Sequence, residues 1–198
     1  PGNSLINGGS ADAAGHWYVA GNWTNDGTHD PGVGTVTFNG PTTVSGDGAH
    51  LFNHLEIAPV ARVVAPDAMT VAGRWLNRGG YFHHGGGRVT VRGDSIIGNG
   101  ADGAFHDLVA DATTPNTRVT GGLEVHDSLL VTGGNFVLKT SLVLGTSALD
   151  GAGTVHVTGD KDAATFSADS GSSVVSADTA VPYRFDVLPG AGIKAWYA

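Results

Sequence analysis

Short runs in which apolar and polar residues alternate, each with a glycine at both ends, recur along this chain. The sequence GTVTFNG at residues 34–40 returns as GRVTVRG at 87–93 and as GTVHVTG at 153–159. Alternation places the apolar side chains on one face of a strand, and the flanking glycines allow the chain to turn. The pattern therefore predicts a series of short β-strands, and Asp30-Pro31-Gly32 predicts a tight turn between two of them.

The similarity between the first two copies extends beyond this motif. GNWTNDG at 21–27 matches GRWLNRG at 73–79, and FNHLEI at 52–57 matches FHDLVA at 105–110. The offset between matching positions is nearly constant, from Trp23 to Trp75 and from Phe52 to Phe105, whereas the third copy of the motif begins later than this period predicts. A near-constant period of about 53 residues is typical of solenoids and repeat arrays.

We therefore predict an all-β chain folded as a right-handed parallel β-helix, or β-solenoid. Residues 17–198 form the solenoid in three related units, 17–72, 73–132 and 133–198, and residues 1–16 are a polar N-terminal arm or an incomplete first coil. Strands every 8–12 residues also fit a β-sandwich or jelly roll. Only a solenoid requires like residues stacked coil upon coil, and at about 20–25 residues per coil a unit contains two to three coils.

The pattern also predicts which side chains fill the core. Apolar residues of the three motif copies are expected to point inward as equivalent rungs: Val36, Phe38, Val89, Val91, Val155 and Val157. The large aromatic residues Trp23, Trp75, Phe52 and Phe105, together with Trp196, could form a sugar-binding stripe. Their matching positions in the repeats favour stacking inside the core instead.

Composition narrows the class of protein. Of 198 residues, 32 are glycine and 40% are hydrophobic, so a core can be buried and wholesale disorder is disfavoured. No segment has convincing helical periodicity, and no apolar run approaches the length of a membrane-spanning helix, about 18 residues or more. The N-terminus shows no basic and apolar signal pattern.

Charge and cysteine content exclude further classes. The formal net charge of −8 disfavours nucleic-acid binding, because an acidic chain repels phosphate backbones. The absence of cysteine excludes disulfides and thiolate metal sites. It is compatible with export, because a long solenoid core is stable without disulfide cross-links.

Residues 21–57, GNWTNDGTHDPGVGTVTFNG through GAHLFNHLEI, resemble the glycine-rich repeat modules of very large bacterial exported surface proteins. Those modules are similar to filamentous-haemagglutinin and other right-handed parallel β-helix passengers, and the final YRFDV and IKAWYA segments resemble the segments that come after such repeats. The resemblance implies secretion, a cell-surface location and a structural or adhesive role. It carries no catalytic motif, and the histidines of this chain depart from the usual Thr or Asn.

Histidines supply the main candidates for metal binding. His83 and His84 lie together in a glycine-rich turn, and stacking of coils could bring His54 near His106 or Asp107. Imidazole and carboxylate together suit zinc or copper. The alternative is that these histidines simply face solvent, and we predict no bound metal or cofactor.

Aspartates in turns raise the question of calcium, which binds oxygen-rich turns in some β-solenoids. Asp26, Asp30, Asp47, Asp94, Asp102 and Asp160 lie among glycine and asparagine. Neither an EF-hand loop nor a calcium-binding nonapeptide array occurs, and aspartates that cap their own backbone explain these positions.

Catalytic motifs are not found. The chain has no G-x-S-x-G, and its three glycines at 85–87 lack the G-K-[ST] ending of a phosphate loop. Glu56 and Glu124 are the only glutamates, and Asp107 with Arg88 or Arg92 is a conceivable but unmarked carbohydrate-cleaving cluster.

The sequence thus favours a non-enzymatic extracellular structural protein, a β-solenoid subunit or segment of a bacterial surface fibre, sheath or adhesin. The alternative is a carbohydrate-binding or carbohydrate-cleaving β-helix. Expected partners are copies of the chain itself, further repeats of a longer chain, or cell-surface glycans. The apolar candidates for self-assembly are Leu5 and Ile6 near the start and Trp196 and Tyr197 near the end, where no polar cap follows.

Overall fold

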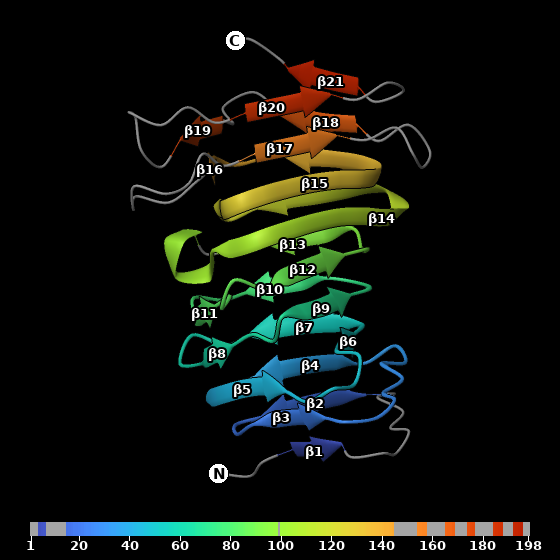
Figure 1. Cartoon of the computed structure of the whole chain (residues 1–198), viewed down its shortest axis with the longest axis vertical. Helices are drawn as coiled ribbons and strands as arrows, with labels where there is room; N and C mark the ends of the chain where they lie inside the picture. Colours follow the sequence, from blue (N-terminus) through green and yellow to red (C-terminus); the bar gives the residue numbers. More distant parts are fainter. Residues whose placement is uncertain are drawn as a thin grey trace.

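The computed structural model describes residues 4–6, 15–98, 100–144, 154–157, 165–168, 174–176, 184–187 and 192–195. Nearly every element in these ranges is a β-strand, and the paired strands run parallel. Figure 1 shows the strands stacked along one long axis, with β1 at one end and β21 at the other. The predicted parallel β-solenoid is confirmed, and the sandwich alternative is wrong because sandwiches are built from antiparallel sheets.

Each coil can be divided into three faces, numbered in the order in which the chain meets them. Face 1 contains β1 (Ser4–Ile6), β3 (Trp23–Asn25), β5 (Pro41–Ser45), β8 (Arg62–Val64) and β11 (Tyr81–His83), and in later coils β16 (Leu142–Leu144) and β19 (Val174–Ser176). Face 2 contains β6 (Leu51–Phe52), β9 (Ala68–Val71), β12 (Arg88–Val91), β17 (Thr154–Val157) and β20 (Arg184–Val187).

Face 3 is the longest ladder of strands. It contains β2 (His16–Val19), β4 (Thr35–Phe38), β7 (His54–Ile57), β10 (Trp75–Asn77), β13 (Ser95–Ile97), β18 (Thr165–Ala168) and β21 (Gly192–Ala195). Paired residues on this face give the length of a coil. Val36 lies opposite Leu55, Leu55 opposite Trp75, and Trp75 opposite Ile96, so each coil here takes about 20 residues, within the range of known solenoid repeats.

Two long strands pass through all three faces. β14 (Phe105–Thr120) and β15 (Leu123–Leu138) each contain 16 residues, where the sequence pattern predicts several separate strands. Their mutual register shifts between Phe105 and Asp107 and twice more before Asn116. The shifts are the bends at which the strands change face, because a bulge adds a residue and turns the chain.

Among the described residues, helical structure is confined to one short element. The 3₁₀-helix η1 (Gly100–Gly103) precedes β14, and the described residues contain no α-helix. Within the same residues, no helix has the length and apolar character needed to cross a membrane.

The sequence repeat is not a whole number of coils. Trp23 is on face 1 and Trp75 on face 3, whereas Val36 is on face 3 and Val89 on face 2. At about 20 residues per coil, a repeat of about 53 residues makes about two and two-thirds turns. The predicted core positions Val36, Phe38, Val89 and Val91 are all buried.

The prediction that these core positions are equivalent rungs is nevertheless wrong. Val89 is in register with Leu108, Leu129 and Val155 on face 2, and Val36 belongs to the ladder of Leu55 on face 3. Similar local sequence therefore recurs on a different face of the coil. The side chains of Val155 and Val157 lie outside the described part of the structure.

Aromatic residues fill the core as expected. Trp23, Trp75, Phe52 and Phe105 have no solvent exposure. The ring centroids of Trp23 and Phe52 are 5.4 Å apart, and those of Trp75 and Phe105 are 4.9 Å apart. These four side chains form packed clusters on the inside and cannot present a sugar-binding stripe. Trp196 lies outside the described residues.

The tryptophan segment of the repeat carries a buried asparagine turn. In GNWTNDG, the Asn25 side chain accepts a hydrogen bond from Gly27 N–H (3.1 Å) and donates one to the Ala49 carbonyl (2.8 Å). In GRWLNRG, Asn77 accepts from Gly79 and Gly80 N–H at 3.0 and 2.9 Å. Both asparagines are buried, so the repeat retains a corner that satisfies its own backbone groups.

The glycines at the ends of GRVTVRG do not have the predicted structural role of allowing the chain to turn. Neither Gly87 nor Gly93 is among the glycines with positive φ. A Cβ atom on Gly93 would overlap the backbone carbonyl of Gly73 on the preceding coil, and one on Gly87 would overlap that of Pro66. These glycines permit close approach of neighbouring coils, while Gly32 (φ 51°) provides the turn expected after Asp30 and Pro31.

The candidate assembly residues are only partly described. Leu5 and Ile6 lie in β1, where they pair with Thr24 and Asn25 of β3. Residues 196–198 lie outside the described residues, so the candidates Trp196 and Tyr197 are not placed.

Candidate functional site

Three histidines lie at the corner between faces 1 and 2 on three consecutive coils. His84 directly follows β11, His106 is the second residue of β14, and His126 is in the first quarter of β15. The ring centroid of His84 is 5.4 Å from that of His106 and 4.8 Å from that of His126. Stacking of coils thus gathers imidazoles that are up to 42 residues apart in the sequence.

Hydrogen bonds connect two of these rings in a directed chain. Gly86 N–H donates to Nδ1 of His84 at 3.0 Å, so this nitrogen carries no proton. Nε2 of His84 must then be the donor to Nδ1 of His126, 3.0 Å away. Nε2 of His126 in turn donates to Oε1 of Glu124 at 2.8 Å. These bonds assign a neutral tautomer to each ring and end on a carboxylate.

The surroundings of His84 favour its neutral form. Burial first, and then the neighbouring His126, His106 and His83, lower the pKa of His84 from 6.5 to about 4. A neutral ring is the form that can accept from Gly86 and donate to His126 at the same time.

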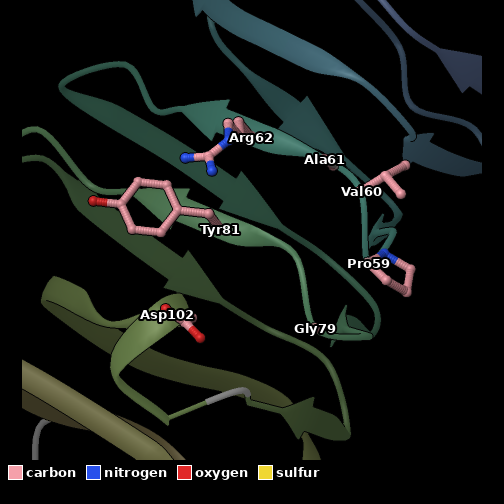
Figure 2. Close-up of a pocket in the computed structure, with 7 residues that line it drawn as sticks. All are labelled: Pro59, Val60, Ala61, Arg62, Gly79, Tyr81 and Asp102. Carbon is pink, nitrogen blue, oxygen red and sulfur yellow. The ribbon is translucent and has the colours of Figure 1, made fainter.

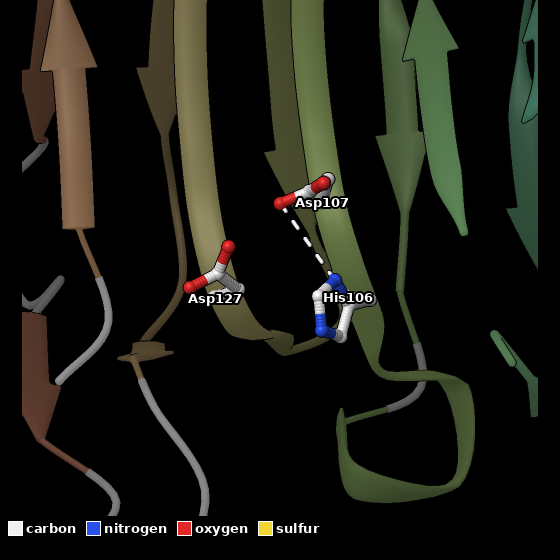
Figure 3. A group of neighbouring side chains, drawn as sticks. All are labelled: His106, Asp107 and Asp127. Carbon is white, nitrogen blue, oxygen red and sulfur yellow. Dashed lines mark ion pairs between the residues drawn. The ribbon is translucent and has the colours of Figure 1, made fainter. Parts of the chain in front are cut away.

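A β-bulge brings an aspartate to the same corner. Phe105 pairs with Val125 and Asp107 with Ser128, so His106 alone faces the two residues His126 and Asp127. One potential ligand atom from each of His106, Asp107 and Asp127 lies within 4.8 Å of the other two. Figure 3 shows His106 and Asp107 on β14 and Asp127 on the neighbouring β15.

Asp107 is held from two sides. Ser128 Oγ donates to Oδ1 of Asp107, and Arg88 Nη2 lies 3.8 Å from Oδ2. His106 Nδ1 is 3.7 Å from Oδ1 of Asp107 but makes no hydrogen bond within the described structure. Of the two arginines considered with Asp107 in the sequence, Arg88 lies beside it, whereas Arg92 pairs with Asp111 at 3.3 Å.

The other predicted candidates lie apart from this corner or at its edge. His54 is on face 3, opposite Thr35, and its Nδ1 accepts a hydrogen bond from Arg74 N–H at 2.9 Å. The expected approach of His54 to His106 or Asp107 is not seen. His83 is exposed and stacks between Tyr81 and His84, with centroids 6.4 and 6.0 Å away.

The corner also contains residues that the sequence pattern does not link to it. Nothing in the sequence marks Asp127, or links His126 and Glu124 to His106. The dipeptide His-Asp occurs three times, at 29–30, 106–107 and 126–127. The interval between the last two copies is about one coil, so it could have indicated the cluster once the coil length was known.

A separate open pocket of about 640 Å³ lies over face 1. Its lining residues are Pro59, Val60, Ala61, Arg62, Gly79, Tyr81 and Asp102. Figure 2 shows Arg62 and Tyr81 at one end and Pro59 and Val60 at the other. The Arg62 guanidinium carbon is 5.8 Å from the centre of the Tyr81 ring, a cation–π distance.

Turn aspartates serve local hydrogen bonds. Asp30 Oδ1 accepts from Gly32 N–H at 2.9 Å, and Asp26 Oδ1 accepts from Asp47 N–H at 3.3 Å on the next coil. The Asp30 contact matches the predicted capping of an aspartate's own backbone, whereas the Asp26 contact joins two neighbouring coils. Asp160 lies outside the described residues.

Comparison of the chain with protein-family models, with curated proteins and with solved structures finds no match. The similarity to exported repeat modules stays a prediction. The fold class rests on the parallel strand pairing described above.

Proposed function

We propose that this chain is a structural segment of a bacterial surface fibre, sheath or adhesin, located outside the cell and without enzymatic activity. The observation that carries the proposal is the unbroken parallel pairing of face 3 from β2 to β21, which extends the molecule along one axis (Figure 1). A repeat stack of this kind gains length by adding coils, because each coil buries its inward side chains on the next.

Outward ion pairs between coils support the same proposal. Arg78 Nε lies 2.6 Å from Glu56 Oε1, and Arg92 Nε lies 3.3 Å from Asp111 Oδ2, each pair joining neighbouring coils. Exposed pairs contribute little stability individually. Ion pairs that join neighbouring coils on the outside are consistent with an elongated solenoid whose lateral surface faces water.

Two experiments test this proposal. Immunogold labelling of intact producing cells should decorate the surface, and label that appears only after permeabilisation would contradict the extracellular location. A screen of polysaccharides for lyase and hydrolase products should detect no turnover. Clear turnover of any polysaccharide by the purified chain would overturn the non-enzymatic assignment.

Carbohydrate binding is the second candidate function, and the face 1 pocket is the observation that favours it. Tyr81, Arg62 and Asp102 offer an aromatic ring, a hydrogen-bond donor and an acceptor to one ligand. On a glycan array, Tyr81→Ala should abolish any specific binding, and Tyr18→Ala, which removes another exposed tyrosine, should not. Binding that survives Tyr81→Ala would exclude this pocket as the sugar site.

A further inference from the structure

The corner formed by His106, Asp107 and Asp127 has the chemistry of a metal site that links two coils. One potential ligand is an imidazole and two are carboxylates. They come from the neighbouring strands β14 and β15, which belong to consecutive coils. We propose that this corner binds a divalent transition-metal ion, with zinc as the representative, through these three side chains.

The distances allow such an ion after a small adjustment. Zinc binds imidazole nitrogen and carboxylate oxygen at about 2.0–2.2 Å, so ligand atoms around it are separated by about 3–3.5 Å. The three potential ligand atoms now lie within 4.8 Å of one another. Asp127 is exposed, so rotation of its side chain can close the remaining gap of about an ångström.

The state of His106 also points to a ligand. Its Nδ1 is shielded from solvent and has no hydrogen-bond partner in the described structure. A buried polar atom of this kind is unfavourable unless something satisfies it. A metal ion between His106 Nδ1 and the carboxylates would satisfy the nitrogen.

Neighbouring residues orient the ligands without competing for the ion. Ser128 and Arg88 hold Asp107, and each carboxylate oxygen keeps a second lone-pair site for a metal. Both nitrogens of His84 and of His126 are engaged in the hydrogen-bond chain that ends on Glu124. These two rings pack around the site and serve as positioning residues.

The donor set selects among metals. Imidazole suits zinc, copper and nickel, whereas calcium and magnesium prefer sites made only of oxygen. The three carboxylates of Asp107, Asp127 and Glu124 exceed the one nearby cation, Arg88, among the residues named at this corner. The local excess of negative charge favours a divalent cation.

Isothermal titration calorimetry of residues 1–198 in chelator-treated buffer tests the site, with zinc chloride as the probe and calcium and magnesium chloride as comparisons. We expect one zinc ion per chain, binding at least tenfold more tightly than calcium. Asp127→Asn and His106→Ala should each weaken zinc binding at least tenfold. Asp47→Asn and His16→Ala, which change an aspartate and a histidine on other coils, should leave it unchanged.

Asp127→Asn keeps the test decisive even if His106→Ala does not fold, because Asp127 is exposed and its replacement retains the shape of the side chain. Zinc affinity that is equal in Asp127→Asn and the parent would overturn the site. Calcium binding as tight as zinc binding would overturn the choice of metal class. The outcome is independent of the surface location and structural role proposed above.

Discussion

The inside of each coil accepts apolar side chains and little else. Inward positions on all three faces are filled mainly by Val, Leu, Ile, Phe and Trp, and the buried polar side chains include the hydrogen-bonded asparagines of the two turns. An ionised group placed there would lose its hydration and gain no partner, which is unfavourable by several kcal/mol. Individual core positions should therefore be highly sensitive to charge.

Val89→Asp is expected to destabilise the solenoid strongly. Val89 is 1% exposed, and its neighbours in register are Met69 and Leu108. A loss of about 3 kcal/mol would lower the melting temperature of a domain of this size by about 6–12 °C. Thermal unfolding measures the effect, with Val60→Asp at a 75% exposed site as the control. A Val89→Asp variant that melts within about a degree of the parent would show that the inward assignment is wrong.

His84 should make stability depend on pH. Its pKa is about 4 in the folded chain, against the ordinary 6.5 expected for the unfolded chain, mainly because of burial. Between these two values the unfolded chain binds more protons, so acid favours unfolding. The contribution of His84 to stability is complete above pH 6.5 and is lost as the pH falls toward 4.

Denaturant unfolding at a pH well above the ordinary histidine pKa and at a pH between the two values, in chelator-treated buffer, measures this effect. The parent should lose more stability between the two conditions than His84→Gln, which has no titrating ring. His50 and His54, whose pKa values are also lowered by burial, remain in both proteins and contribute equally. The same pH dependence in both proteins would contradict the assignment.

Neighbouring elements are packed so closely at the corners that the distance between coils limits which residues fit. Gly93, two residues after β12, faces the backbone of Gly73, two residues after β9. Strands in a ladder are about 4.8 Å apart, which leaves no room for a side chain that points at the next coil's backbone. Glycine at this position is therefore a requirement of coil stacking.

Gly93→Ala should destabilise the protein by about 2 kcal/mol or more, because the added methyl group meets the Gly73 backbone, which cannot rotate away. Gly15→Ala is the matched control, since a Cβ atom there has nothing within 4 Å. Urea unfolding of both variants gives the comparison. If Gly93→Ala and Gly15→Ala have the same midpoint, close approach of the coils is not what demands glycine.

For the whole molecule, each end of the stack is a surface where a strand has a ladder partner on one side only among the described strands. β1 pairs only with β3 and β21 only with β18 among the described strands. Such edges can add a strand from another chain, and Lys194 is the only charged residue of β21. A head-to-tail contact does not close on itself, so it would propagate into a filament.

We therefore expect purified residues 1–198 to form end-to-end or side-by-side polymers, with the segment 1–16 able to pair with the open coil of the next subunit. Light scattering and negative-stain microscopy of the parent and of a variant lacking residues 1–16 measure assembly. Monodisperse monomers at high concentration, unchanged by the deletion, would rule out the polymer. They would favour further repeats of a longer chain as the cover for each end.

The sequence alone determined the fold class and part of the core. Alternation with period two marks strands wherever Val36, Phe38, Val89 and Val91 occur, and the near-constant offset between repeats distinguishes stacked coils from a sandwich. These signals are local or periodic, so they can be recognised without coordinates. The turn at Asp30–Gly32 was predictable for the same reason.

Only the tertiary structure decided which residues share a face and which meet across coils. Trp23 and Trp75 look equivalent in sequence but lie on different faces, because the repeat is not a whole number of coils. The proximity of Asp127 to His106 depends on one extra residue in β15 that shifts the register of its strand. Coil length and bulges are set by the packing of the whole stack, and a local pattern of residues does not encode either of them.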